Sequence, residues 1–372
     1  MPNFFIGLMS GTSLDGIDAV LLDFSASKPR VAIAQSASFA TNFRADLLAL
    51  NTPGDNELHR AALAANQLAL EYAAVVQALL DQAGIPASQV RAIGAHGQTV
   101  RHQPQLGYTI QLNNPALLAE RTGVDVVADF RSSDVAAGGQ GAPLVPAFHQ
   151  AWFAQPGRSS AVLNLGGMSN LTLLPNQGPV QGFDCGPGNV LLDLWCLAHT
   201  GLAYDHDGAW AATGVVLPQL LAQLLGEPYF AQEPPKSTGR DLFNPTWLSE
   251  RLRGFENCQP QDVAATLTAL TAQVCARDLL GYGPQTQQLL VCGGGALNAQ
   301  LMRELTVALP GVQVESTTVQ GLKPMQVEAA AFAWLAYAWC ETQPGNLSAV
   351  TGARGPRVLG ALYRAPREQL KS

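Results

Sequence analysis

The chain places two carboxylates, Asp15 and Asp18, beside a turn of glycine and hydroxyl residues. Apolar runs precede and follow this turn, so we expect a β-hairpin with the turn at its tip. Glycine lets the backbone approach a ligand closely, and successive N–H groups in such a turn form an anion site. Carboxylates beside a phosphate require a divalent cation, because Mg²⁺ takes oxygen ligands from carboxylates and substrate phosphates. The pattern indicates a nucleotide and metal site, and a solvated hairpin tip is the alternative.

Two further glycine turns follow apolar strands much later in the chain. Gly166 and Gly167, with Asn170, lie between two apolar runs and resemble the first hairpin, which suggests a duplicated unit. The turn Gly293-Gly294-Gly295, with Asn298, opens a helix, an arrangement that favours an anionic or nucleotide group. We expect the three turns to meet only across a cleft between two lobes. The expected nucleotide contacts of the first turn are Gly11, Thr12, Ser13, Leu14, Asp15, Gly16, Ile17 and Asp18.

Asp184 lies between the second hairpin and an expected helix at 190–200. Unpaired N–H groups and the helix dipole stabilise a carboxylate just before a helix, so a plain N-terminal cap is one interpretation and a functional carboxylate is the other. Cys185, its neighbour, is expected to be a buried thiol and not a nucleophile, since no histidine lies near it in the sequence. Both interpretations of Asp184 stay open on the residues alone.

Five other side chains are candidates for binding a substrate. Glu328 is isolated in an apolar helix expected at 325–340, where a charge is costly unless it is paired, so it faces solvent or a site. Arg131 suits a carboxylate, because its guanidinium can form two parallel hydrogen bonds. His96 is either a ligand or a structural histidine. Thr99 and Asp129 are weaker candidates of the same kind.

These residues need a scaffold, and the sequence predicts an α/β one. We expect helices at 60–83 and 116–122 and strands at 90–95, 108–112 and 124–128. Strands that alternate with helices, and polar residues at the strand ends, describe an α/β domain with its site at the strand termini. A chain of 372 residues favours two domains, and a helix expected at 143–154 leads out of the first.

Composition restricts the class of protein. The residues are 47% hydrophobic and 13% charged, and the net charge is −7, which is typical of a compact soluble enzyme. Only four lysines occur, which argues against nucleic-acid binding. No secretory signal is visible, and the most apolar stretches are too short to span a bilayer, so we expect a cytoplasmic protein without membrane partners. Six scattered cysteines without a C-x-x-C pair predict neither a disulfide framework nor a zinc site.

Other nucleotide-binding signatures are missing: no Gly-Lys pair for a Walker loop, no G-x-G-x-x-G after a first strand, and no protein-kinase motifs. The three glycine turns resemble the sugar kinase/Hsp70/actin superfamily. Within it, the chain resembles the anhydro-N-acetylmuramic acid kinase family through five motifs in sequence order. These motifs lie at 7–18, 96–99, 182–189, 236–240 and 291–295.

The resemblance implies a two-lobed, RNase H-like α/β fold with an interlobe cleft. Lobe I would comprise 1–145 and about 340–372, and lobe II 146–339. It also implies an ATP- and Mg²⁺-dependent kinase that opens the anhydro ring of a cell-wall amino sugar and phosphorylates it, and a homodimer. A kinase for another small sugar or acid, or an actin- or Hsp70-like nucleotide switch, remains the alternative.

In this family pattern Asp184 is the general base and Glu328 lies at the sugar. For such a substrate, Arg131 suits the lactyl carboxylate. One departure from the superfamily concerns the metal. Where ordinary sugar kinases have an aspartate at the end of the first strand, this chain has Met9 and Ser10. Metal contact must then come from Asp15, Asp18 or elsewhere.

Overall fold

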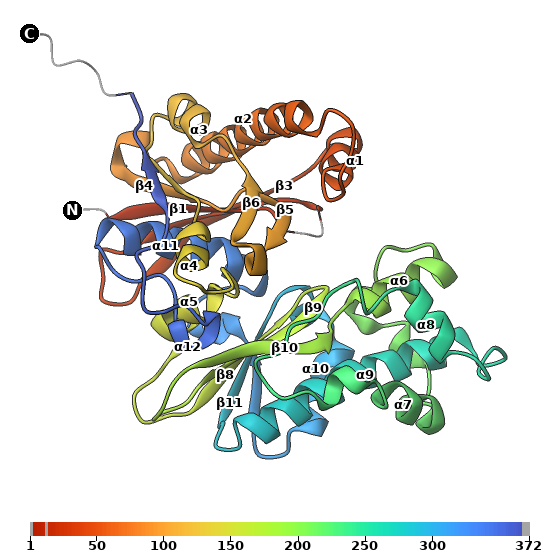
Figure 1. Ribbon diagram of the computed structural model, residues 1–372. Coiled ribbons are helices and arrows are strands. Elements are labelled where there is room, and N and C mark those ends of the chain that lie inside the picture. The colour runs from red at the N-terminus through yellow and green to blue at the C-terminus, as the bar shows by residue number, and fades with distance from the viewer. Residues whose placement is uncertain (1–2, 12–13, 367–372) are drawn as a thin grey trace, which may run out of the picture. The chain divides into compact units, whose positions relative to one another are not determined.

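The computed structural model describes residues 3–11 and 14–366, which form two compact units (Figure 1). The first unit contains the chain up to Trp152 and again from Gln326, and the second contains Phe153–Met325. The sequence had placed the segment up to 339 in the second lobe. The structure instead assigns helix α11 (Val327–Cys340) to the first unit, because α11 packs on the strands of the first sheet.

The first unit is built on a six-stranded sheet in the order β13-β7-β4-β1-β2-β3. Strands β1 and β2 form the expected hairpin, β3 continues it antiparallel, β4 and β7 run parallel to β1, and β13 is an antiparallel edge. The strands are β1 (Phe4–Met9), β2 (Gly16–Asp23), β3 (Arg30–Ser38), β4 (Val90–Ala95), β7 (Val126–Ala128) and β13 (Ala361–Tyr363). A separate hairpin joins β5 (Gln98–Gln103) to β6 (Tyr108–Leu112).

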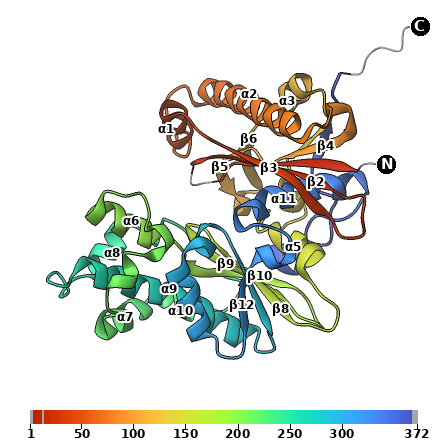
Figure 2. The same ribbon diagram turned by 180° about the vertical axis from the view of Figure 1, so that it is seen from behind.

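Helices cover both faces of this sheet, with α2 and α3 on one side and α11 on the other (Figures 1 and 2). A Cβ on Gly7 of β1 or Gly94 of β4 would overlap the backbone of α11, so these glycines let the helix approach the sheet closely. The helices are α1 (Thr41–Ala49), α2 (Glu57–Ala83), α3 (Pro115–Thr122), α4 (Ser132–Ala136), α5 (Val145–Phe153), α11 and α12 (Ser348–Thr351).

Helix α2 is, by length and apolar composition alone, able to cross a membrane, which the sequence analysis did not anticipate. In the structure it is a core helix along one side. Leu68, Tyr72, Val76 and Leu79 are buried there, in the hydrophobic cluster of the first unit. Its apolar composition is therefore explained by packing within the unit.

The second unit repeats the strand order of the first. Its five strands follow the order β10-β9-β8-β11-β12, with β8, β9 and β10 antiparallel and β11 and β12 parallel to β8. The first five strands of the first unit have the corresponding order β3-β2-β1-β4-β7, so the expected duplication is confirmed. The strands are β8 (Ser160–Leu165), β9 (Met168–Leu174), β10 (Gln181–Pro187), β11 (Gln288–Cys292) and β12 (Gln313–Ser316).

The second sheet packs against the long helix α9, which contacts β9 and β10 and is buried along much of its length. This contact forms a core separate from that of the first unit. The helices of this unit are α6 (Val190–Thr200), α7 (Pro218–Leu225), α8 (Pro245–Arg251), α9 (Pro260–Tyr282) and α10 (Ala299–Ala308).

Most expected elements are present, with shifted ends. The helix expected at 60–83 begins at Glu57, and the strand expected at 124–128 begins at Val126. The largest change of role concerns Asp184, which lies within strand β10 opposite Asn170, whereas the N-cap residue of α6 is Asn189. The interpretation of Asp184 as an N-terminal cap is therefore wrong.

Candidate active site

The first glycine turn is fixed by backbone and side-chain contacts of the first unit. The Gly11 carbonyl accepts hydrogen bonds from Leu14 N at 3.1 Å and from Gln98 Nε2 at 3.2 Å. The side chains of Leu14 and Ile17 are buried, so these two residues can offer a ligand only their backbone. Thr12 and Ser13, also expected to bind nucleotide, lie outside the described residues.

Ser10 ties this turn to two other segments, and the sequence analysis gave it no role beyond the turn. Its hydroxyl donates to Gly97 O at 3.0 Å. A hydroxyl has one proton, so the buried Tyr72 hydroxyl, 2.9 Å away, must be the donor in the second contact. Burial raises the pKa of Tyr72, and the group stays protonated. This chain of bonds holds the first turn against the end of β4.

The two acidic residues of the hairpin have different surroundings. Asp15 is exposed, and its carboxylate lies 3.5 Å from the Arg44 guanidinium. Asp18 is partly buried and accepts a hydrogen bond of 2.7 Å from Ser36 Oγ. Desolvation raises the pKa of Asp18, and the nearby charge of Asp15 adds to this. Asp18 is thus the carboxylate of the hairpin that would gain most from a cation.

His96 and Arg131 form a directed pair at the ends of neighbouring strands. Arg131 Nη2 lies 2.9 Å from His96 Nε2, and since arginine only donates, Nε2 is the acceptor. Nδ1 therefore carries the proton and faces Ser10 O at 3.3 Å. Burial, helped by the charge of Arg131, lowers the pKa of His96 to about 3, so the ring is neutral at physiological pH.

Arg131 keeps one buried donor without a partner among the described residues. Nη1 donates to Gly141 O at 2.7 Å, whereas the buried Nε has no hydrogen-bond partner within the described part of the chain. Burial lowers the pKa of Arg131 to about 10, so the guanidinium keeps its charge at neutral pH. Sequence reasoning missed Asp134, which fixes this loop. Its buried carboxylate accepts from Gly141 N, Asn346 Nδ2 and Thr351 Oγ1, at 2.7, 2.5 and 2.7 Å.

Glu328 lies in the first turn of α11 and joins this group electrostatically. Its side chain has exposed surface, but the surrounding protein desolvates the carboxylate and raises its pKa. The charge of Asp18 adds to this rise, and Arg131 opposes it. The first unit therefore brings Asp18, Glu328, Arg131 and His96 into one neighbourhood.

Thr99 and Asp129 make local contacts. Thr99 Oγ1 accepts from Gln111 Nε2 of the paired strand at 3.2 Å. Asp129 has a left-handed backbone, with φ of 60°, and its carboxylate accepts from the hydroxyl and amide of Ser132 at 2.5 and 3.4 Å. These contacts account for both residues structurally.

In the second unit, the two later glycine turns lie side by side because β11 pairs with β8. A Cβ on Gly293 would press on the backbone of Leu165, and φ at Gly293 is 75°, so glycine is needed there. Asn189 is bonded to the first of these turns and lies beside the second. Its Nδ2 donates to Leu165 O at 2.8 Å and its backbone N–H donates to Gly166 O at 2.8 Å, and its side chain lies next to Gly295. The turns thus form one backbone-lined surface.

The remaining expected nucleotide contacts lie close to this surface. Gly294 and Gly295 begin a short 3₁₀ turn after Gly293. Asn298 Oδ1 accepts from Leu301 N at 2.9 Å and caps α10, which the sequence analysis had not foreseen. The guanidinium of Arg240 lies beside Gly167.

Asp184 is held at four points. Its amide donates to Lys236 O at 3.1 Å, and its carbonyl accepts from Tyr229 OH at 2.8 Å. Carboxylate Oδ2 accepts from Ser237 Oγ at 3.0 Å and from Thr238 N at 3.1 Å. Burial raises the pKa of Asp184, while these two donors and the charge of Lys236 oppose the rise.

The motif at 236–240 was visible in the sequence, but its role was not, because its contacts to Asp184 span about fifty residues of chain.

Cys185, next to Asp184, is buried, and hydrogen bonding with Cys275 and burial raise its pKa well above the ordinary thiol value. It is therefore an inert thiol, which agrees with the expectation from sequence.

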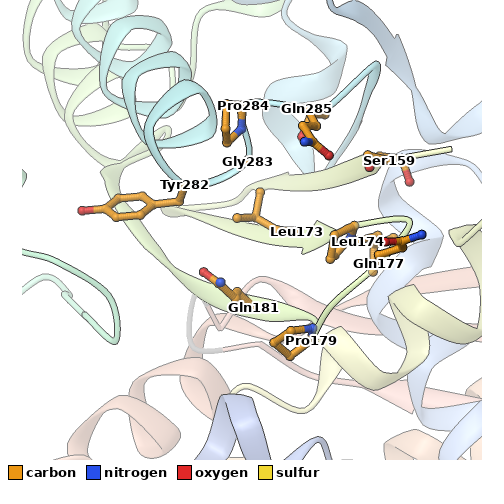
Figure 3. A pocket seen from close by; sticks show the side chains of 13 residues that line it. Ser159, Leu173, Leu174, Gln177, Pro179, Gln181, Tyr282, Gly283, Pro284 and Gln285 are labelled. Carbon is orange, nitrogen blue, oxygen red and sulfur yellow. The ribbon is translucent and has the colours of Figure 1, made fainter.

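A hollow of about 250 Å³ lies at the opposite end of the β8–β9 hairpin from Gly166, and Figure 3 shows the side chains that line it. Prolines, glutamines, serines and leucines line it, together with Tyr282. Its lining residues include no carboxylate and no basic group, so acid–base chemistry is not supported there. The site with chemical potential lies at the glycine turns and at Asp184.

The repeated strand order, with a glycine hairpin opening each sheet, defines the class of the fold: a two-unit, RNase H-like α/β protein of the sugar kinase/Hsp70/actin type. A family model described as "Anhydro-N-acetylmuramic acid kinase" matches residues 3–365. A protein of that name from Variovorax paradoxus (strain S110) is 61% identical and covers 97% of this chain and 99% of its own. The chain belongs to the anhydro-N-acetylmuramic acid kinase family, and it is an ATP-using sugar kinase.

A second relative of the same name, from Albidiferax ferrireducens, is 58% identical and covers 98% of this chain and 100% of its own. Among solved structures, a ROK family glucokinase from Streptomyces griseus covers 90% of this chain and 99% of its own, at 16% identity and a TM-score of 0.41. That likeness is too low to bear on function.

Proposed function

We propose that Asp184 is the general base of this kinase. The enzyme opens the 1,6-anhydro ring of its amino sugar with water and transfers a phosphoryl group from ATP, giving N-acetylmuramic acid 6-phosphate. The observation that carries the proposal is the fixed carboxylate of Asp184: both hydrogen bonds found for it among the described residues reach Oδ2. Oδ1 is therefore the oxygen that accepts the proton of the attacking water.

The raised pKa of Asp184, which is caused by burial, suits a base, because a carboxylate with a higher pKa binds a proton more strongly. Attack of this water on the anomeric carbon, opposite the bridging oxygen, inverts that centre, as in an inverting glycosidase. The released oxygen takes the γ-phosphoryl group. No separate general acid is then required, and transfer depends mainly on alignment and charge neutralisation.

We assign ATP binding to the backbone of the glycine turns. Gly166, Gly167 and the turn at Gly293–Gly295 supply a surface without side chains in the second unit, and Asn170 and Asn298 lie at its edges. In the first unit, we assign further phosphate contacts to the turn between β1 and β2. Peptide donors in such turns bind phosphate without requiring lysine, which agrees with the scarcity of lysine in the chain.

We assign the magnesium contact to Asp18. Within residues 3–11 and 14–366, no three acidic, histidine or cysteine side chains gather as a metal site. A cation that arrives with ATP needs only one or two carboxylates, so the donor set fits Mg²⁺ in that form. Asp18 and Glu328 repel each other, which a cation would relieve, whereas Asp15 is turned toward Arg44. Bound Mg²⁺ would neutralise phosphate charge during transfer.

We assign sugar recognition to the first unit. The charged guanidinium of Arg131, with its unpartnered Nε, suits the lactyl carboxylate of the sugar. His96 orients Arg131 as a neutral acceptor, and Glu328 is available for sugar hydroxyls. Thr99 and Asp129 remain candidates at the margin of this group.

The proposal extends to location and assembly. All six cysteines are free thiols, which agrees with a reducing compartment, and we propose a cytoplasmic enzyme. We further propose a homodimer, as the family resemblance implies, and, from the scarcity of lysine and the expectations from sequence, no nucleic-acid or membrane partner.

Sugar-dependent ATP consumption tests the function. Purified protein with ATP and Mg²⁺ should release ADP in proportion to added anhydro-N-acetylmuramic acid, with one phosphorylated sugar formed for each ATP. N-acetylglucosamine and glucose serve as control acceptors and should give only background. Equal turnover with a control sugar would favour another small-sugar kinase. ATP consumption indifferent to every sugar, but responsive to a protein partner, would favour an actin- or Hsp70-like switch.

A further inference from the structure

Behind Asp184 lies a buried ion pair that the proposed chemistry does not use. Lys236 Nζ lies 2.8 Å from Asp278 Oδ2, and the two side chains are 0% and 3% exposed. Asp278 belongs to α9, whereas Lys236 belongs to a stretch without helix or strand between Gln232 and Asn244. The pair therefore joins an irregular segment to the most buried helix of the second unit.

The same segment holds Asp184. The backbone carbonyl of Lys236 accepts a hydrogen bond from the backbone N–H of Asp184. The next two residues, Ser237 and Thr238, donate hydrogen bonds to Asp184 Oδ2. Ser237 is itself exposed and cannot fix its own position by packing. The Lys236 side chain is the buried part of this run, and it also lies over the rings of Phe183 and Tyr229, at 5.9 and 5.4 Å.

A buried ion pair is weak support for stability alone, because desolvation of two charges offsets their attraction. Apolar residues of similar volume would fill the same space at no greater cost. An ion pair at this place therefore suggests a role in positioning. The segment that it anchors donates two hydrogen bonds to the carboxylate that is assigned as the base.

We propose that the Lys236–Asp278 ion pair is a positioning device for Asp184: it anchors the 236–238 segment so that Ser237 and Thr238 direct the carboxylate toward its substrate. This inference rests on the proposed role of Asp184. Lys236 and Asp278 are positioning residues and do not touch the sugar or ATP.

The charges around Asp184 agree with this role. The positive charge of Lys236 lowers the pKa of Asp184 against the rise caused by burial. Tyr229 and Cys185 face the same region and are neutral, because their pKa values are raised. The other groups nearby are Cys275, Asp278 and Arg277, whose guanidinium lies 3.9 Å from Asp278. Lys236 is thus the cation that acts on Asp184 from within the protein.

The test uses two double variants that leave no lone buried charge. Lys236→Met/Asp278→Leu removes the pair, and Lys236→Gln/Asp278→Asn replaces it with a neutral hydrogen-bonded pair of similar size. In the first variant we expect kcat to fall by about 10- to 100-fold per folded molecule, with KM for ATP unchanged. A displacement of a catalytic group by about 1 Å lowers the rate by a factor of this order. The acid limb of the pH profile should also move to higher pH. The second variant should lose less.

Two single variants complete the design. Ser237→Ala removes one donor from an exposed position, so it should fold and move the acid limb in the same direction by a smaller amount. Arg277→Met is the matched control: it removes a cation beside Asp278 that contacts Phe230 O and not the 236–238 segment, so kcat and the acid limb should stay as in the wild type.

A purely structural pair would lower the melting temperature without changing kcat or the acid limb of the folded protein, and that result overturns the proposal. If Lys236→Met/Asp278→Leu does not fold, Lys236→Gln/Asp278→Asn takes its place in the test. A kcat and an acid limb equal to those of the wild type then contradict the proposal, and an intermediate loss of kcat supports it. Asp184→Asn, measured in parallel, separates the base assignment from the positioning role. Full activity in Asp184→Asn would remove the base assignment itself, whereas an inactive Asp184→Asn beside normal double variants removes only the positioning role.

Discussion

At the scale of single residues, the properties of the charged groups come from neighbours distant in the sequence. Asp184 receives its hydrogen bonds from Ser237 and Thr238, and His96 is fixed as the Nδ1–H tautomer by Arg131 on one side and Ser10 on the other. Both side chains are desolvated, but with opposite results, because burial disfavours the charged form of each. The pKa of the acid rises and the pKa of the imidazole falls.

The first prediction concerns the pH dependence of catalysis. Because the pKa of Asp184 is raised, the base becomes protonated at a pH above the usual aspartate range, and kcat/KM should fall on the acid side beginning there. His96, with a pKa near 3, should add no limb near pH 6.5. Rates measured from pH 4.5 to 8 check this. An acid limb near 6.5 that disappears in His96→Gln would show that His96 titrates during turnover, against this account.

The second prediction concerns stability. The pKa of His96 in the folded protein lies below the unfolded value of about 6.5, so as pH falls below 6.5 the unfolded chain takes up the proton first. Stability is therefore full above that pH and falls by up to about 1.4 kcal/mol per pH unit between roughly 6.5 and 3. Urea unfolding of His96→Gln at pH 7 and 5.5 should show a smaller loss than the wild type. The exposed His59 supplies the control, since His59→Gln should keep the wild-type loss.

At the scale of elements, close packing on glycine decides where the functional side chains lie. Helix α11 carries Glu328 and rests directly on β1 and β4, where Gly7 and Gly94 leave no side chain between helix and sheet. The distance between α11 and the sheet therefore determines the position of Glu328 relative to Asp18 and Arg131.

The third prediction follows from this contact. In Gly94→Ala the new Cβ overlaps the carbonyl oxygen of Phe332, so α11 must shift, and we expect a loss of about 1–3 kcal/mol in the free energy of unfolding. KM for the sugar should rise more than KM for ATP, since Glu328 moves with the helix. Gly281→Ala, in α9 with open space around it, is the control and should be neutral or stabilising by up to about 1 kcal/mol. An unchanged sugar KM in a destabilised Gly94→Ala would contradict the role of α11.

Local patterns in the sequence were sufficient for many elements. Apolar runs around glycine turns predicted both hairpins, and helical spacing predicted α2 and α6 to within a few residues. The sequence could not assign α11 to the first unit, because that depends on a packing partner more than two hundred residues away. For the same reason it missed Asp134, whose partners Asn346 and Thr351 lie near the end of the chain, and the contacts of Asp184.

At the scale of the whole molecule, the same strand order occurs in both units, but the two units carry different sets of candidate site residues. The first unit gathers Asp18, Glu328, Arg131 and His96, whereas the second gathers two glycine turns and Asp184. The chain leaves the first unit after α5 and returns to it at α11, so each unit keeps its own hydrophobic core. This arrangement suggests a division of labour in which the second unit supplies the base and two of the three glycine turns for the nucleotide, and the first unit supplies the residues for the sugar and the metal.

The fourth prediction tests that division by hydrogen exchange of the full chain. A non-hydrolysable ATP analogue should slow amide exchange in the glycine turns at 166–170 and 293–298. The anhydro sugar alone should slow exchange around 131–141 and at the start of α11. Protection by the nucleotide that leaves the second unit unchanged would contradict the assignment of its glycine turns.

The turnover of Asp184→Asn with anhydro-N-acetylmuramic acid, measured together with the affinity of this variant for ATP, tests the assignment of the general base. Asparagine preserves the shape of the side chain but is not a base. We expect ATP binding and the melting temperature to stay near those of the wild type, and sugar-dependent ADP release to fall by at least about 10²–10⁴-fold. Turnover within a few-fold of the wild type would show that another group removes the proton from water.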